Sequence, residues 1–170
     1  MTCLFCDMIQ KNEGVVYSDS HIVALLHPLP ATVGHVVVMP REHIPIFENI
    51  PDYRVADLMK KAKKISVGVF ETIKCEGTNV MIQSGVAAGQ KYAHAMVHII
   101  PRQEGDNLPL GWKPRQFNEE ELSVVELKLK EAAKDIGAFE KEQAKPKEVK
   151  APEKISGEKD YLVKGWERVP

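Results

Sequence analysis

The sequence predicts an α+β domain in which an antiparallel sheet packs against one long helix. Two observations support this fold class. Short β-branched and apolar runs alternate with turn-forming residues over 15–40 and 78–101, as strands and their turns do. Residues 52–74 instead repeat their apolar side chains at helical spacing, with a basic stretch largely on the opposite face. The 170 residues are enough for one compact domain with an appendage.

The expected elements begin and end with helices. For the first helix we expect Thr2 as the N-cap and Gly14 as the residue that ends it. For the last helix we expect Asn118 as the N-cap, because Glu121 completes a capping-box pattern. In chain order the expected elements are the helix 2–11, the strands 15–17, 21–26 and 34–39, the helix 52–74, the strands 78–84 and 93–101, and the helix 118–136.

The composition changes sharply after the last of these helices. Residues 138–160 are dominated by lysine, glutamate, proline and alanine without apolar periodicity, so we expect a charged, flexible linker. Residues 161–170 restore apolar content with Tyr161 and Trp166, which indicates a segment that docks on this domain or on a partner subunit. The domain with its helical C-terminal extension is therefore expected to span residues 1–137.

Charge and cysteine content argue against several classes of protein. A formal net charge of −1 and a pI of about 6.6 give no global basic field for a nucleic acid polymer or an acidic membrane. No apolar run approaches the roughly 20 residues that cross a bilayer, and the N-terminus lacks the pattern of a signal peptide. The three cysteines, of which Cys3 and Cys6 are close neighbours, argue against a disulfide framework. We expect a cytoplasmic protein.

The strand 93–101 carries the candidate chemistry. Since side chains alternate along a strand, His94, Met96 and His98 share one face, and the apolar residues between them share the face against the long helix. A single histidine there would more often be a hydrogen-bonded structural residue, but two in register beside a glycine-containing loop indicate a site. The glycines and small residues of that loop, 83–91, allow backbone N–H groups to approach an anion.

The run 89–102, Gly-Gln-Lys-Tyr-Ala-His-Ala-Met-Val-His-Ile-Ile-Pro-Arg, resembles the signature of the histidine triad (HIT) family. Residues 34–43 resemble the family's Gly-His strand, which is followed by a proline and a basic turn. The resemblance extends over residues 1–105. It implies a HIT-like nucleotide-binding fold, often a homodimer, that hydrolyses or transfers nucleoside monophosphate groups through a nucleotidyl-histidine intermediate. Its implied ligands are dinucleoside polyphosphates, nucleoside phosphoramidates and related adenylated compounds.

Carried over position by position, the resemblance assigns most of a nucleotide site. It implies that His35 and His98 surround the α-phosphate. His27 stands where relatives place an acidic or amide residue for the ribose hydroxyls, and an imidazole can also hydrogen-bond a hydroxyl. Lys91 stands where relatives place Ser or Thr near the leaving group, which favours a polyphosphate leaving group. The implied nucleotide-binding residues are His27, Gln83 (ribose or phosphate), Gly89, Gln90 (phosphate donor), Lys91 and His98.

Met96 occupies the position of the family's nucleophile, an imidazole that attacks the α-phosphorus. A thioether has negligible basicity and no proton to exchange, so it gives no stable phosphoryl adduct, although it fills the space of an imidazole. We therefore expect a nucleotide-binding chain that is a catalytically crippled variant of a HIT-type hydrolase or nucleotidyl transferase. The alternative is a non-catalytic nucleotide-sensing module that uses its C-terminal tail for a partner. Histidine and methionine codons share no base, and both a deliberate replacement and natural decay stay open as the origin of Met96.

Cys3 and Cys6 form a two-residue-spaced pair that supplies half of a tetrahedral zinc site. Such a pair can also be redox-active or simply buried. The resemblance to zinc-bearing HIT proteins implies that His43 and His94 complete the ligand set. We therefore expect a structural Zn²⁺ ion that ties the N-terminal helix to the triad strand and leaves His98 free for phosphate. A zinc-stabilised structural protein without a nucleotide ligand is a further alternative.

Overall fold

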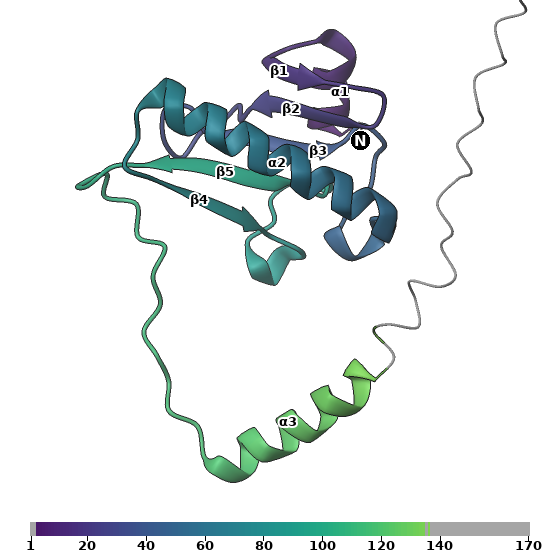
Figure 1. The fold of residues 1–170 in the computed structure, drawn as a ribbon, viewed down its shortest axis with the longest axis vertical. Helices are drawn as coiled ribbons and strands as arrows, with labels where there is room; N and C mark the ends of the chain where they lie inside the picture. The colour runs from purple at the N-terminus through teal and green to yellow at the C-terminus, as the bar shows by residue number, and fades with distance from the viewer. Residues whose placement is uncertain (1–2, 135, 137–170) are drawn as a thin grey trace, which may run out of the picture.

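The computed structural model describes residues 3–134 and residue 136. The strands lie in the order β1-β2-β3-β5-β4, and every neighbouring pair is antiparallel (Figure 1). The elements in chain order are α1 (Leu4–Lys11), β1 (Val15–Ser18), β2 (Ile22–Leu26), β3 (Val36–Pro40), η1 (Phe47–Asn49), α2 (Asp52–Ile73), β4 (Gly77–Ile82), η2 (Val86–Ala88), β5 (Val97–Arg102) and α3 (Glu119–Ala133). The predicted α+β fold with one long packed helix is confirmed.

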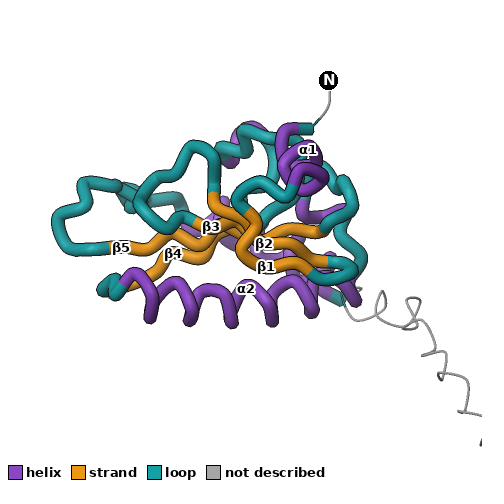
Figure 2. The backbone as a smooth tube through the Cα atoms, turned by 90° about the horizontal axis from the view of Figure 1, so that it is seen from above, coloured by secondary structure: helices purple, strands orange, loops and turns teal. Residues whose placement is uncertain are grey.

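Helices α1 and α2 lie on opposite faces of the sheet (Figure 2). On β3, Val36 and Val38 belong to the apolar cluster under α2, while Val37 and Met39 belong to the cluster under α1. Alternating side chains therefore enter two different cores. This explains why β2 and β3 read as continuous apolar runs, since both of their faces are buried.

The triad strand is shorter than the sequence predicted. Strand β5 begins at Val97, not at residue 93, because its other neighbour β4 ends at Ile82, the partner of Val97. Before Val97 the backbone pairs with a loop instead, since the Ala95 N–H donates to the Ile44 carbonyl at 2.6 Å. The predicted alternation of faces nevertheless holds, because Ala95 packs in the cluster under α2 and Met96 packs in the cluster under α1.

The ends of helix α1 also differ from the prediction. Cys3, not Thr2, is the N-cap, and its side chain makes no capping hydrogen bond. The helix ends at Asn12, which adopts a left-handed conformation with φ 57°, two residues before Gly14. The N-terminal turn of α1 thus presents the side chains of Cys3 and Cys6 to the rest of the domain.

Helix α3 stands apart from the sheet (Figure 1), and all its side chains are exposed. Its predicted N-cap is confirmed, because the Asn118 side chain accepts the N–H groups of Glu120 and Glu121 at 2.7 and 3.2 Å. The expected linker 138–160 and docking segment 161–170 lie outside the described residues. Within the described part of the chain, no helix combines the length and apolar character needed to span a membrane.

Candidate functional site

A cleft of about 420 Å³ opens beside the triad strand, and every residue that the sequence assigned to catalysis or nucleotide binding lines it. Its wall comes from the ends of β2 and β3, from β4 and β5, and from the loops before and after β5. The lining residues are His27, Leu29, Pro30, Ala31, His35, Met81, Gln83, Gly89, Gln90, Lys91, Tyr92, Met96, His98, Ile100, Leu108 and Leu110.

A chain of hydrogen bonds fixes the tautomers of two histidines in the cleft. The Ala31 N–H donates to Nδ1 of His35 at 3.1 Å, so this nitrogen carries no proton. In the neutral ring the proton then sits on Nε2, which lies 3.1 Å from Nδ1 of His98 and donates to it. The proton of a neutral His98 therefore sits on Nε2. His98 becomes a directed N–H donor because a backbone amide determines which nitrogen is protonated.

His27 is oriented in the same way. The Leu29 N–H donates to its Nδ1 at 3.0 Å, which leaves Nε2 as the donor of the neutral ring. Its ring stacks on that of His35, with centroids 4.6 Å apart and an interplanar angle of 6°. The structure thus brings His27, His35 and His98 together, as the sequence predicted.

Burial keeps these imidazoles neutral. Burial, followed by the neighbouring imidazoles, lowers the pKa of His35 and of His98 to about 4 each. Burial is also the largest cause that lowers the pKa of His27. Near neutral pH the three rings act as hydrogen-bond donors and not as cations, and Lys91 supplies the positive charge among the lining residues.

Met96 lines the cleft but belongs mostly to the core. It is 4 % exposed and packs in the cluster under α1, which contains Phe5 and Val37. Among the described lining residues there is no serine, cysteine or carboxylate, and the thioether of Met96 has negligible basicity. The cleft therefore presents imidazole donors and one lysine, and Met96 contributes an apolar side chain to its wall.

Several polar groups of the loop before β5 form hydrogen bonds within the loop or to neighbouring backbone. The Gln90 amide N–H groups donate to the carbonyls of Pro45 and Tyr92 at 2.6 and 2.8 Å, and its oxygen accepts the Gly85 N–H at 2.7 Å. The backbone N–H groups of Ala88 and Gly89 also donate within the loop. Gln90 therefore braces the loop in this structure, and its implied phosphate contact stays a prediction.

Gly89 is required by geometry. Its φ of +89° lies in the left-handed region, and a Cβ added to it would lie 2.6 Å from Nε2 of Gln83. The Gln83 side chain thus lies against Gly89, where any larger residue would crowd it.

The second cluster joins the N-terminal turn of α1 to the start of the triad. Nε2 of the fully buried His94 donates to the Pro40 carbonyl at 2.9 Å, so its Nδ1 lone pair faces outward. This Nδ1 lies 3.6 and 3.7 Å from the Sγ atoms of Cys3 and Cys6, and Nδ1 of His43 lies 3.4 Å from Cys6 Sγ. The four ligand atoms lie within 4.8 Å of one another, so the predicted set converges.

The spacing of these atoms fits a tetrahedral cation. Zinc bonds of about 2.3 Å to sulfur and about 2.05 Å to nitrogen, at a tetrahedral angle, separate the two ligands by about 3.6 Å. The observed nitrogen–sulfur distances of 3.4 to 3.7 Å scatter around that value. Burial lowers the pKa of His94, which keeps its lone pair available to a metal. Two soft sulfur and two imidazole donors are the set that Zn²⁺ prefers.

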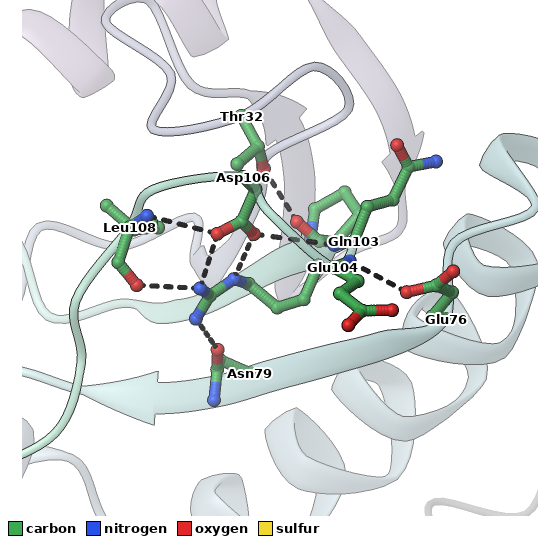
Figure 3. A network of polar contacts seen from close by, with 9 residues as sticks. Thr32, Glu76, Asn79, Gln103, Glu104, Asp106 and Leu108 are labelled. Atoms are coloured by element: carbon green, nitrogen blue, oxygen red, sulfur yellow. Dashed lines mark hydrogen bonds and ion pairs between the residues drawn. The ribbon is translucent and has the colours of Figure 1, made fainter.

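Sequence reasoning missed the far wall of the cleft, to which Leu108 and Leu110 contribute. A polar network around Asp106 holds this segment (Figure 3). The Arg102 guanidinium donates to both Asp106 carboxylate oxygens at 2.5 and 2.7 Å, and to the Asn79 side chain and the Leu108 carbonyl. The Pro-Arg pair of the signature was visible in the sequence, but its acidic partner was not assigned a role.

An antiparallel sheet that presents a triad strand to a histidine-lined cleft, beside a Cys₂His₂ cluster, defines a class of small α+β domain. A family model named HIT domain matches residues 9–105, and the chain belongs to the HIT family. This is a family of nucleotide-binding proteins that includes nucleotide hydrolases.

Two curated relatives illustrate the range of the family. An uncharacterised HIT-like protein of Methanocaldococcus jannaschii is 38% identical over 106 residues, which cover 61% of this chain and 81% of the relative. The adenylylsulfatase HINT3 of Arabidopsis thaliana is 32% identical over 108 residues, which cover 62% of this chain and 55% of the relative.

Solved structures agree with the fold. A HIT family protein from Bacillus subtilis superposes with a TM-score of 0.70 at 26% identity, covering 77% of this chain and 96% of that chain. A zinc-bound histidine triad family protein from Mycobacterium smegmatis gives 0.59 at 29% identity, with coverages of 68% and 85%. A hypothetical histidine triad nucleotide-binding protein from Sulfolobus tokodaii gives a TM-score of 0.58 at 32% identity, with coverages of 72% and 85%.

Proposed function

We propose that this protein binds a nucleoside phosphate in the histidine-lined cleft and has lost the covalent step of HIT hydrolases and nucleotidyl transferases. The observation that carries the proposal is the hydrogen-bond chain from Ala31 through His35 to His98. It aims a neutral N–H donor from the half-buried ring of His98, which is a good partner for a phosphate oxygen. The nucleotide-binding and adenylylsulfatase relatives support a nucleotide as the ligand.

Each residue of the cleft has a role in this proposal. His98 donates from Nε2 to the α-phosphate, and His35 holds the ring of His98 in the required tautomer. His27 donates from Nε2 to a ribose hydroxyl. Lys91 lies beside the leaving group, where its charge offsets the negative charge of a polyphosphate or sulfate. Gln83, Gly89 and Gln90 shape the loop around the phosphate.

The missing step concerns Met96. In an active relative of this design an imidazole nitrogen would form a bond to the α-phosphorus while the bond to the leaving group breaks, and water would then release the nucleoside monophosphate. The thioether of Met96 has no basic lone pair for that bond. The protein is therefore expected to hold its ligand without turning it over.

Restoring the nucleophile tests the proposal. We expect Met96→His to raise release of nucleoside monophosphate from a dinucleoside polyphosphate or from adenylyl sulfate by at least about a hundredfold, the lower end of what a catalytic side chain contributes. Mass spectrometry should detect a nucleotidyl adduct on the introduced imidazole. Met96→Leu is the matched control, because it keeps the apolar packing and adds no nucleophile. Tight nucleotide binding without activity in Met96→His would favour the non-catalytic sensing module.

We also infer a structural Zn²⁺ ion at Cys3, Cys6, His43 and His94. The ligand spacing and the carbonyl partner of His94 support it, as does the zinc-bound relative from Mycobacterium smegmatis. The ion would link α1 to the residues just before β5 and so fix one side of the cleft. The described cysteines are all free thiols, which fits a reducing compartment such as the cytoplasm.

A homodimer is the last part of the proposal. Strand β4 forms the edge of the sheet, where its outer backbone groups are available to another strand. Val80 on β4 is 46% exposed, and Val67 and Phe70 on α2 are 49% and 45% exposed. Light scattering across a dilution series should give twice the mass of one chain, and Val80→Lys should shift the equilibrium toward monomer.

A further inference from the structure

The segment that follows β5 continues the wall of the cleft toward an exposed tryptophan. Leu108 and Leu110 line the cleft, and Trp112 follows two residues after Leu110. Two residues of chain span at most about 7 Å, so the backbone of Trp112 lies within about that distance of Leu110. Trp112 is 87% exposed, so its indole ring is free to contact a ligand that extends out of the cleft past Leu110.

The start of this segment is held in place. Asp106 accepts from the Arg102 guanidinium, and its Oδ1 also accepts the Leu108 N–H at 3.0 Å (Figure 3). The hydrogen bonds from Arg102 are the largest cause that holds the pKa of Asp106 well below its usual range. The tryptophan therefore extends from a fixed point on the wall.

Positive charge accompanies the tryptophan. Lys113 and Arg115 follow it, are exposed, and form no ion pair with any residue that the structure describes. Lys91 lines the cleft to which Leu110 also contributes. An aromatic ring interleaved with cations suits a ligand that has both a planar base and phosphates.

We propose that Trp112, with Lys113 and Arg115, forms a second subsite that takes the distal nucleoside of a dinucleoside polyphosphate. This inference rests on the proposed function, because it requires the first nucleotide to occupy the cleft with its α-phosphate at His98. The second base stacks on the indole ring, and the two cations lie along the phosphates between the halves. A nucleoside monophosphate reaches the first site only.

The chain offers a built-in reporter for this subsite. It contains two tryptophans, Trp112 and Trp166, so Trp166→Phe leaves Trp112 as the only indole fluorophore. In that background we expect diadenosine polyphosphate to quench the fluorescence on binding, and AMP to bind by calorimetry with little quenching. Because Met96 blocks turnover in the proposed function, the dinucleotide affinity can be measured at equilibrium.

Substitutions separate the two subsites. We expect Trp112→Ala to weaken diadenosine polyphosphate binding at least tenfold, as the loss of one base–aromatic stack does, and to leave the AMP affinity unchanged. Trp112→Phe should retain most of the dinucleotide affinity. The double change Lys113→Ala with Arg115→Ala should flatten the salt dependence of dinucleotide binding and leave that of AMP unchanged.

The outcomes distinguish this inference from the proposed function. If AMP binds and Trp112→Ala leaves dinucleotide affinity unchanged, the second subsite is wrong and the proposed function stands. The same conclusion follows if AMP binds but the dinucleotide binds no more tightly and quenches nothing. If neither ligand binds to the full chain, the proposed function itself is wrong.

Discussion

Acid should destabilise this protein through the histidines of its cleft. Burial lowers the pKa of His35 and His98 to about 4 in the folded chain, against 6.5 for an unperturbed imidazole. Between those values the unfolded chain binds more protons than the folded chain, so the free energy of unfolding falls as the pH falls through this window. The stability is fully present above about pH 6.5 and is progressively lost toward pH 4.

The size of the effect follows from these pKa values. At about pH 5 an imidazole that ionises freely only when unfolded costs the folded state about 2 kcal/mol relative to pH 7.5. His98→Asn removes one such group and keeps a polar side chain at the site. We expect the loss of unfolding free energy between about pH 7.5 and 5 to be smaller by about 2 kcal/mol in this variant.

Urea unfolding followed by circular dichroism at the two pH values measures this difference. The Cys₂His₂ cluster is the same in both chains, so the difference between the chains isolates His98. An equal loss in the two chains would show that His98 ionises in the folded protein near its ordinary pKa. That result would refute the hydrogen-bond chain that makes His98 a neutral donor.

Two further predictions concern the metal cluster and the loop. Cys6→Ser should abolish stoichiometric zinc binding, measured by atomic absorption, and lower the melting temperature. Cys75→Ser is the control, because Cys75 lies outside the cluster. Zinc retained by Cys6→Ser would contradict the site. Gly89→Ala should weaken AMP binding, measured by calorimetry. It should also lower the free energy of unfolding by about 1 kcal/mol or more, because the residue has φ +89° and its Cβ would press on Gln83. Gly68→Ala is its matched control: it meets nothing within 4 Å inside α2 and should stabilise the protein by about 0.5–1 kcal/mol. Equal AMP affinities in the two glycine variants would argue against a binding role for the loop.

The sequence predicted the parts of the fold that depend on periodicity. Helix α2 was placed within one residue of its observed end, because 22 residues of helical spacing give a strong signal. The faces of the triad were also correct, since alternation persists where the backbone leaves the sheet. The start of β5 was not, because it depends on where the neighbouring strand β4 ends, at Ile82, which the local pattern does not show.

The sequence predicted which residues lie at the site better than it predicted their hydrogen-bond partners. The cleft gathers His27, His35 and His98 as the resemblance implied. The bonds that occupy the Gln90 amide reach Pro45, a residue 45 positions away, and no local pattern reveals such a partner. Leu108 is held at the wall by Arg102, which donates to its carbonyl, and by Asp106, which accepts its N–H. Contacts of this kind follow from the tertiary fold and not from the residue types alone.

The side chain at position 96 packs in the apolar core and also lines the cleft. A reactive imidazole there must give up water to sit beside Phe5 and Val37, whereas a methionine fills the same space with apolar contacts. An active version of this cleft is therefore expected to be less stable than the present one. In the proposed function, the loss of the nucleophile is therefore accompanied by a gain in apolar packing. A return to activity would then need stabilising changes elsewhere in the chain.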